Sequence, residues 1–388
     1  MKLSKALSRI APSSTAAMSD RAAELRAAGR DIISLSVGEP DFATPLHVIA
    51  AAKASLDQGD TKYTPVSGTL AVRKAAALHF ERDLGIAVRP SQVIISAGGK
   101  QAIFHALCAT LDPGDEVLIP APWWVSYPEI VRFAGGTVVP LETTPASHYR
   151  ITPAQLEAAI RANTRWLLLN SPGNPTGAVY PASELEVLGE VLLRHPQVMV
   201  LSDDIYAPLR YVESRHATLA ALCPALAGRV LTVSGLSKSH AMTGFRIGLA
   251  AGPEWLIQAM GKLQSHSMGS PSTTSQAAAV AALEGPQDFL ADWCAIMRRR
   301  RDAVVAAINQ IPGLSAPIPD GAFYIMVDAA PHMVRFGDDN ALCLHLLDHG
   351  VALVPASAFG GRDGFRISFA ASEATLNEAV RRIAKALA

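Results

Sequence analysis

A lysine and an arginine lie eight residues apart in the stretch SGLSKSHAMTGFRIG, at positions 234–248. Lys238 follows a predicted strand and has Ser, Gly and Ala as neighbours, so a group larger than the lysine itself has room beside it. A surface lysine is the alternative, but small neighbours after a buried strand favour a pocket. The amine of a lysine in such a pocket can attack an aldehyde and form an imine.

A glycine-rich turn follows the predicted strand at 92–96 and leads into a helix. Gly98 and Gly99, just before Lys100, leave backbone N–H groups open at the helix N-terminus, where the helix dipole favours an anion such as phosphate. A plain tight turn would also account for both glycines. The chain lacks GxxxxGK[ST] and GxGxxG, which argues against a nucleoside-triphosphate loop and a dinucleotide fingerprint.

Two further predicted strands end in polar side chains. Asn174 stands between Gly and Pro in a turn after one strand, either as part of a rigid loop or as a fixed hydrogen-bonding group. Asp203 and Asp204 end the strand at 198–202, and Tyr206 follows them. Two adjacent carboxylates at the end of a buried strand are costly unless one of them meets a cation, although a helix N-cap accounts for one.

Ligands of open parallel sheets bind at the carboxyl ends of the strands, so these groups are expected to meet at one edge. Together the strand ends offer an anion cradle, an amide, a carboxylate, a phenol and a lysine. Pyridoxal 5′-phosphate (PLP) uses all five, because its aldehyde forms an imine with lysine, its phosphate needs a cradle and its ring nitrogen pairs with a carboxylate. The strand ends therefore predict a PLP site.

The elements that must position these groups alternate between short apolar runs and amphipathic helical stretches. This pattern is typical of an α/β fold with a mostly parallel sheet that helices cover on both faces. The predicted strands are 92–96, 116–120, 137–141, 165–170, 198–202, 229–233 and 246–251.

The pattern changes near residue 286, where a long helical stretch leads into short strands and a final helix. We expect a second, smaller domain of α+β type there, to which the N-terminal segment contributes. The predicted division is an N-terminal arm with part of the small domain at 1–44, a large PLP-binding domain at 45–285, and a small C-terminal domain at 286–388.

Composition disfavours several other classes of protein. The 388 residues are 49% hydrophobic, and 34 basic residues balance 34 acidic ones, so nucleic acid is not an expected partner. The run Arg298–Arg301 is interpreted as a solvated helix face. The four cysteines form no CxxC pair, which disfavours a metal site and fits reduced thiols in a cytoplasmic protein. No apolar stretch suits a signal peptide or a membrane span, so no membrane partner is expected.

Nine short motifs carry a family resemblance over most of the chain. They are VGEPDFATP, TKYTPVSG, GGKQA, PWWVSYPE, NSPGNPTGAVY, SDDIY, SGLSKSHAMTGFRIG, DGAFY and GFRISFA. Each motif is moderately specific, but together and in this order they resemble the class I/II aminotransferases of PLP fold type I, most closely the bacterial aspartate aminotransferase branch. The resemblance implies a large domain with a mostly parallel seven-stranded sheet, a smaller α+β domain, and a PLP-dependent transaminase.

The resemblance also implies roles for the cofactor contacts. Lys238 resembles the lysine that forms the imine with PLP and moves the proton between the substrate Cα and C4′, which requires a lowered pKa. Asp203 resembles the carboxylate that keeps the pyridine nitrogen protonated. Tyr206 and Asn174 resemble the pair that hydrogen-bonds the phenolic oxygen of the ring. Arg246 resembles the arginine that binds the phosphate.

Four more positions match cofactor contacts of the family. Trp124 resembles the aromatic residue stacked on the ring. Gly99 and Lys100 match the phosphate cradle. Tyr63 matches a tyrosine that reaches the phosphate from the other subunit, so the resemblance implies a homodimer with its sites at the subunit interface.

Substrate contacts follow in the same way. Arg366 resembles the arginine whose planar fork binds the substrate α-carboxylate, beside Trp124 and Asn174. Gly38 would let the backbone approach the same carboxylate. One departure is Gly235, which stands where many relatives have a phosphate-binding serine.

The choice of substrate depends on fewer residues. In this branch Lys100 is associated with the distal carboxylate of dicarboxylic substrates. Relatives that also use prephenate pair this lysine with a threonine in a PSxT stretch, which corresponds to Thr15 here. Such relatives often have a basic residue just before that Pro, whereas this chain has Ala11. L-Aspartate and 2-oxoglutarate in a ping-pong reaction are therefore expected first, and prephenate or aromatic amino acids second.

Other activities remain as alternatives. The same scaffold supports PLP-dependent C–S β-lyases, because a fold does not dictate its reaction. A PLP-sensing regulator would need a DNA-binding domain ahead of this fold, and a nicotinamide dehydrogenase would need a glycine fingerprint. Both are disfavoured by the sequence.

Overall fold

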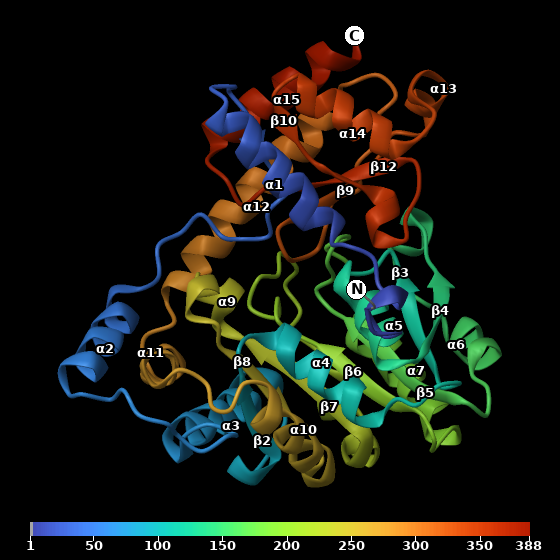
Figure 1. Cartoon of the computed structure of the whole chain (residues 1–388). Helices are drawn as coiled ribbons and strands as arrows, with labels where there is room; N and C mark the ends of the chain where they lie inside the picture. The colour runs from blue at the N-terminus through green and yellow to red at the C-terminus, as the bar shows by residue number, and fades with distance from the viewer. Residues whose placement is uncertain (1–2) are drawn as a thin grey trace.

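The computed structural model describes residues 3–388, and a seven-stranded sheet forms the centre of its larger part (Figure 1). The strands are β2 (Val93–Ser96), β3 (Glu116–Ala121), β4 (Thr137–Glu142), β5 (Thr164–Asn170), β6 (Met199–Asp203), β7 (Val230–Gly235) and β8 (Gly248–Ala251). Their order is β2-β8-β7-β6-β5-β3-β4, and β8 alone among them runs antiparallel to its neighbours. The predicted mostly parallel, seven-stranded sheet is confirmed.

One strand begins later than predicted. The stretch at 246–251 was expected to be extended throughout, but β8 begins at Gly248. Arg246 has a φ of 53°, in the left-handed region, so the chain turns there before it joins the sheet. This turn separates the Arg246 side chain from the row of buried strand residues.

Helices cover both faces of the sheet, as the alternation of strand residues requires. The helices that pack on β5 are α4 (Gly99–Thr110), α5 (Ser126–Ala134), α6 (Pro153–Ala159), α7 (Ala182–Arg194) and α10 (Glu254–Ser267). Trp166 and Leu168 belong to a buried cluster with α4, α5 and α10 on one face. Leu167 and Leu169 belong to a cluster with α6 and α7 on the other face. A third cluster packs β2 and β8 against α2 (Leu46–Asp57), α3 (Leu70–Leu84) and α11 (Thr273–Glu284). Two single-turn helices, α8 (Leu219–Leu222) and α9 (Leu236–Ser239), lie on either side of β7 in the chain.

The smaller unit follows the long helix α12 (Phe289–Ile308), which confirms the helix predicted in this region. It contains a three-stranded antiparallel sheet of order β11-β12-β9, where the strands are β9 (Tyr324–Asp328), β11 (Val354–Pro355) and β12 (Gly364–Ser368). Its helices are α13 (Met333–Phe336), α14 (Asp339–Asp348) and α15 (Glu373–Leu387). The two short strands and the final helix expected in this region are thus present.

The N-terminal segment packs with the C-terminal unit (Figure 1), where the blue helix α1 (Ser14–Ala27) lies beside the orange and red elements. Strand β1 (Ile33–Ser34) pairs in parallel with β10 (Val351–Ala352), and Met18 and Ala22 belong to the same buried cluster as α12 and α15. We propose the division at residues 44/45 and 285/286 on the basis of this packing.

The arginine run on α12 differs from its interpretation as a solvated face. Arg300 is only 8% exposed and forms a two-fold hydrogen bond with Asp41, at 2.7 and 2.8 Å. Arg301 is 9% exposed and donates to the carbonyl of Pro319 at 2.9 Å. Arg298 donates to the carbonyl of Tyr211 at 2.6 Å, so most of the run ties α12 to other segments of the chain. Within residues 3–388 no helix combines the length and apolar character needed to cross a membrane.

Candidate active site

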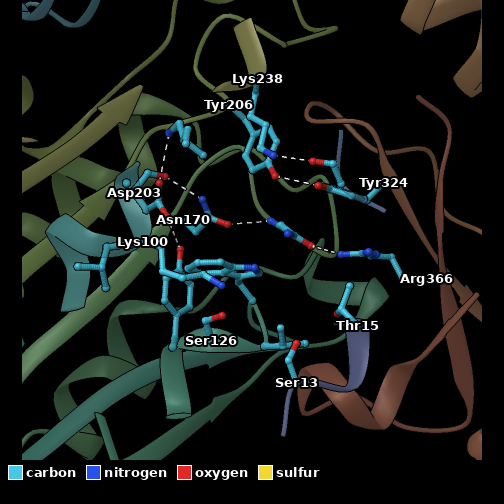
Figure 2. A pocket seen from close by; sticks show the side chains of 18 of the residues that line it. Ser13, Thr15, Lys100, Ser126, Asn170, Asp203, Tyr206, Lys238, Tyr324 and Arg366 are labelled. Carbon is cyan, nitrogen blue, oxygen red and sulfur yellow. Dashed lines mark hydrogen bonds between the residues drawn. The ribbon is translucent and has the colours of Figure 1, made fainter. Parts of the chain in front are cut away.

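A cavity of about 320 Å³ opens at the carboxyl ends of β5, β6 and β7, between the large sheet and the smaller unit (Figure 2). Its lining brings together residues that are up to 353 positions apart in the chain, from Ser13 to Arg366. Those of the predicted site residues that line it are Thr15, Gly38, Gly99, Lys100, Trp124, Asn174, Asp203, Tyr206, Lys238 and Arg366.

Lys238 lies in the single turn of α9, immediately after β7, and its side chain is partly buried. Its ammonium group donates to the carbonyl of Gly38 at 2.5 Å. Burial lowers the pKa of Lys238 to about 8, and Glu39 opposes this shift while Arg246 adds to it. Because part of the amine is then neutral near physiological pH, it can act as a nucleophile or as a base.

Asp203 ends β6 and is buried. The phenol of Tyr127 donates to Oδ2 at 2.6 Å, and the N–H of Ile205 donates to Oδ1 at 3.3 Å. Burial raises the pKa of Asp203 to about 6, against the lowering effect of the Tyr127 hydrogen bond. Within residues 3–388 it forms no salt bridge, so a cation that entered the cavity would find an unpaired carboxyl group.

Arg366, on β12, is 2% exposed and lies between the rings of Tyr324 and Phe359, whose centroids are 4.5 and 4.7 Å from its guanidinium carbon. It donates to Oδ1 of Asn174 at 2.9 Å and to the carbonyl of Ser36 at 2.5 Å. Its Nε is buried without a partner, and burial lowers the pKa of the group. A buried guanidinium that faces only neutral acceptors in the described chain is suited to bind an anion.

Asn174 and Tyr206 both line the cavity, but their present hydrogen bonds go to different partners. Asn174 accepts from Arg366, whereas the Tyr206 hydroxyl bonds that of Tyr324 at 2.9 Å. Gly38 lies against the same tyrosine, since a Cβ at Gly38 would come within 2.2 Å of the Tyr324 hydroxyl oxygen. Only glycine therefore fits at this position beside Lys238.

The turn that was predicted to cradle an anion lies where α4 begins at Gly99. Gly98 precedes the helix with a φ of 91°, and a Cβ there would lie 2.5 Å from Nη2 of Arg246. Arg246 does not line the cavity, but its charge lowers the pKa of Lys100 further, after burial as the main cause. A helix N-terminus, an approaching guanidinium and an absent side chain together suit a phosphate group.

The backbone crossing beneath this cradle gives a testable prediction. A Cβ at Gly248 would lie 2.3 Å from the carbonyl carbon of Gly98 and 2.4 Å from the nitrogen of Gly99. We expect Gly248→Ala to push the turn outwards and to lower the free energy of unfolding by about 1–3 kcal/mol, as overpacking does. Urea unfolding measures this loss. Gly228→Ala is the control, because no atom lies within 4 Å of its added methyl group, and equal stability of both variants would contradict the prediction.

The far side of the cavity is polar and partly cationic. Figure 2 places Ser13, Thr15 and Ser126 across the pocket from Lys238. The Thr15 hydroxyl is buried without a hydrogen-bond partner. Lys100 places its ammonium group 4.9 Å from the centre of the Trp124 ring, within cation–π range.

Tyr63 is the predicted residue that lies farthest from this arrangement. It is 99% exposed and lines a separate surface hollow with Ser270 and Thr273. The structure of one chain therefore does not bring Tyr63 into the cavity.

Several residues of the cavity were not predicted from the sequence. Asn170, the last residue of β5, donates to the Asp203 carbonyl and accepts from the N–H of Asn174, both at 2.8 Å. Tyr127 stands three residues after Trp124 at the start of α5, so helical spacing could have placed it on the same face. The missed lining residues that make these polar contacts or add hydroxyl groups are Ser13, Ser19, Ser126, Tyr127, Asn170 and Tyr324.

Comparison with known proteins agrees with this geometry. The family "Aminotransferase class I and II" matches residues 30–383. The chain is 48% identical to an aspartate/prephenate aminotransferase of Cereibacter sphaeroides, over 98% of this chain and 97% of that protein, and 43% identical to an aspartate aminotransferase of Bacillus subtilis, over 99% and 98%.

A solved structure gives the same result. The crystal structure of the aspartate aminotransferase from Rhizobium meliloti superposes with a TM-score of 0.95 at 45% identity, and covers 100% of this chain and 99% of that one. The resemblance and the fold type inferred from the sequence motifs are thereby confirmed. The chain belongs to the class I and II aminotransferase family, and it is an aminotransferase with the type I fold.

Proposed function

We propose that this aminotransferase binds PLP and transfers the amino group of L-aspartate to 2-oxoglutarate by a ping-pong reaction. The observation that supports it most is the cavity lined by two cations, the buried guanidinium of Arg366 and the ammonium group of Lys100, whose side chain is more exposed. Two cations suit the two carboxylates of aspartate and of 2-oxoglutarate. The test is glutamate formation from aspartate and 2-oxoglutarate by the purified protein, and no glutamate would contradict the proposal.

The residues present fit PLP. Asp203 offers a buried carboxyl group without a counter-ion, which suits a protonated ring nitrogen. The N-terminus of α4, with Arg246 beside it, suits the phosphate. Trp124 would lie against the ring and Tyr206 would donate to its hydroxyl oxygen. When bound, PLP supplies a ring that withdraws electrons from the substrate Cα.

Arg366 and Lys238 would act on the substrate. The guanidinium of Arg366 would bind the α-carboxylate through its planar fork, and Asn174 would keep the fork oriented. This contact fixes the Cα–H bond relative to Lys238. The neutral amine of Lys238 would then take the proton from the substrate Cα and carry it to C4′ of the cofactor, which its lowered pKa favours.

Prephenate is a second candidate acceptor. The relative from Cereibacter sphaeroides is named an aspartate/prephenate aminotransferase, and the unpartnered Thr15 hydroxyl lies on the distal side of the cavity. The test is the rate with prephenate in place of 2-oxoglutarate. A rate indistinguishable from background would exclude this second activity.

A homodimer in the cytoplasm completes the proposal. Tyr63 is almost fully exposed in the single chain, which suits a residue that reaches the phosphate site of a second copy. Analytical ultracentrifugation of the protein with PLP measures the oligomeric state. A monomer would contradict the proposal that two subunits share each site.

Lys100→Met tests the substrate assignment. The ammonium group is partly buried above Trp124, so its loss removes a charge from the distal side of the cavity. We expect kcat/KM for aspartate to fall by about 10- to 100-fold, the effect of one charged hydrogen bond, while the values for alanine and phenylalanine change little. The exposed Lys385→Met serves as control. Equal losses for all three amino acids would remove Lys100 from the specificity argument.

A further inference from the structure

We propose that Tyr127 is a positioning residue, whose phenol fixes the orientation of the Asp203 carboxylate and keeps it ionised for the cofactor. The inference rests on the proposed use of PLP. It concerns a residue that would touch neither the substrate nor the reacting atoms, but that would act through Asp203.

The first argument is the geometry of the carboxyl group. Tyr127 is 3% exposed, and its hydroxyl donates to Oδ2 of Asp203 at 2.6 Å. Oδ1 accepts a longer bond of 3.3 Å from the N–H of Ile205. Each oxygen thus has one donor from the chain, and the shorter bond belongs to the phenol. Rotation of the carboxyl group about its Cβ–Cγ bond would break both bonds, so Tyr127 holds one orientation.

The second argument concerns charge. The titratable groups that act on Asp203 are Tyr127 from α5, the adjacent Asp204 and Lys238 from α9, and Tyr206 lies near both Asp203 and Tyr127. Burial and the charge of Asp204 raise the pKa of Asp203, whereas the Tyr127 hydrogen bond is the largest effect that lowers it. Without that bond, a larger fraction of Asp203 would be protonated near neutral pH. A protonated carboxyl group cannot serve as counter-ion to a protonated ring nitrogen.

The third argument is that one helical turn supports two cofactor contacts. The ring of Tyr127 meets that of Trp124 edge to face, with centroids 5.2 Å apart and an angle of 83°. The backbone N–H of Tyr127 also donates to the carbonyl of Trp124 at 3.0 Å. Tyr127, at the start of α5, therefore orients both Asp203, which would pair with the ring nitrogen, and Trp124, which would cover the ring. Phenylalanine at position 127 would keep the second support and remove only the first.

The experiment compares PLP affinity as a function of pH in Tyr127→Phe, in Tyr211→Phe and in the unaltered protein. Tyr211 is a matched control, because it is also a buried tyrosine whose phenol donates to a carbonyl, that of Ala322, in the smaller unit. Quenching of tryptophan fluorescence gives the dissociation constant between pH 5 and 8. The titration of PLP itself is common to all three proteins and cancels in the comparison.

Tyr127→Phe is expected to raise the pH at which PLP affinity is lost by about one unit, because one hydrogen bond to a charged group corresponds to about one pKa unit. Binding should then weaken about threefold at pH 6.5 and about tenfold at pH 5. Tyr211→Phe should match the unaltered protein. Replacement of Tyr127 by 3-fluorotyrosine, a stronger donor of the same shape, should shift the profile in the opposite direction and does not depend on the folding of Tyr127→Phe.

Two outcomes would overturn the inference, and they are distinguishable. Binding of PLP by the unaltered protein, with the same pH profile in Tyr127→Phe and in the fluorotyrosine protein, would refute the role of Tyr127 alone. Absence of PLP binding by the unaltered protein would refute the proposed cofactor together with it.

Discussion

Lys238→Ala is expected to lower kcat for transamination by roughly 10⁴-fold or more, because it removes both the nucleophile and the base of the proposed reaction. The alanine side chain cannot take a proton from the substrate Cα. Among residues 3–388, the other lysine that lines the cavity is Lys100, which lies on α4 and not at the end of β7. The measurement is the steady-state rate with aspartate and 2-oxoglutarate at saturating PLP. Activity within tenfold of the unaltered protein would contradict the assignment.

The same variant should keep its fold. Burial gives Lys238 a pKa of about 8 in the folded protein, below the ordinary value of 10.5, so the folded state binds the proton more weakly than the unfolded state. Its destabilising effect is therefore complete below about pH 8 and disappears as the pH rises to 10.5. We expect PLP-free Lys238→Ala to be at least as stable as the unaltered protein at pH 7, and thermal unfolding monitors this. Lys385→Ala, at an exposed site, controls for the loss of a lysine.

Arg366→Lys should have the second-largest effect. A lysine keeps one positive charge but loses the planar fork, and it cannot stack between the rings of Tyr324 and Phe359. We expect kcat/KM for aspartate to fall by about 10²- to 10³-fold, the range for breaking a buried charged contact. Because the α-carboxylate is common to all amino acids, the loss should be similar for aspartate, alanine and phenylalanine.

This pattern separates Arg366 from Lys100, whose replacement should affect aspartate selectively. Arg299→Lys is a suitable control, since its ion pair with Glu373 is exposed. An unchanged KM for every amino acid in Arg366→Lys would contradict the assignment of the α-carboxylate site. A loss confined to dicarboxylic substrates would instead place the distal carboxylate at Arg366.

Most strands could be predicted because they are continuous apolar runs with buried residues on both faces, although the edge strand β4 buries only Leu141. Val93–Ser96 and Met199–Asp203, for example, are buried at every position. The failure at 246–251 has a local cause, because the left-handed conformation of Arg246 leaves no trace in the apolar pattern. Arg300 and Arg301 were misjudged for a different reason. Their partners, Asp41 and the Pro319 carbonyl, are distant or belong to the backbone, so helical periodicity alone cannot indicate them.

The candidate site shows the same limit. Lys238 and Asp203 could be found because they follow apolar strands, and ligands bind at such strand ends. The hydrogen bond between Tyr127 and Asp203 joins residues 76 positions apart, and that between Arg366 and Asn174 joins residues 192 positions apart. Such pairs depend on the packing of the smaller unit and of α5 against the sheet edge. The sequence therefore indicates which side chains can take part in the chemistry, whereas only the folded structure shows which of them are in contact.

The most direct test of the account is the visible absorption spectrum of the purified protein, with PLP added and then with L-aspartate but no oxo acid. We predict that PLP produces a visible band that depends on Lys238, and that aspartate removes this band as the amino group passes to the cofactor. The Lys238→Ala protein should not produce the band. A protein that shows no band after PLP is added, or a band that aspartate and glutamate leave unchanged, would contradict the proposed site and reaction.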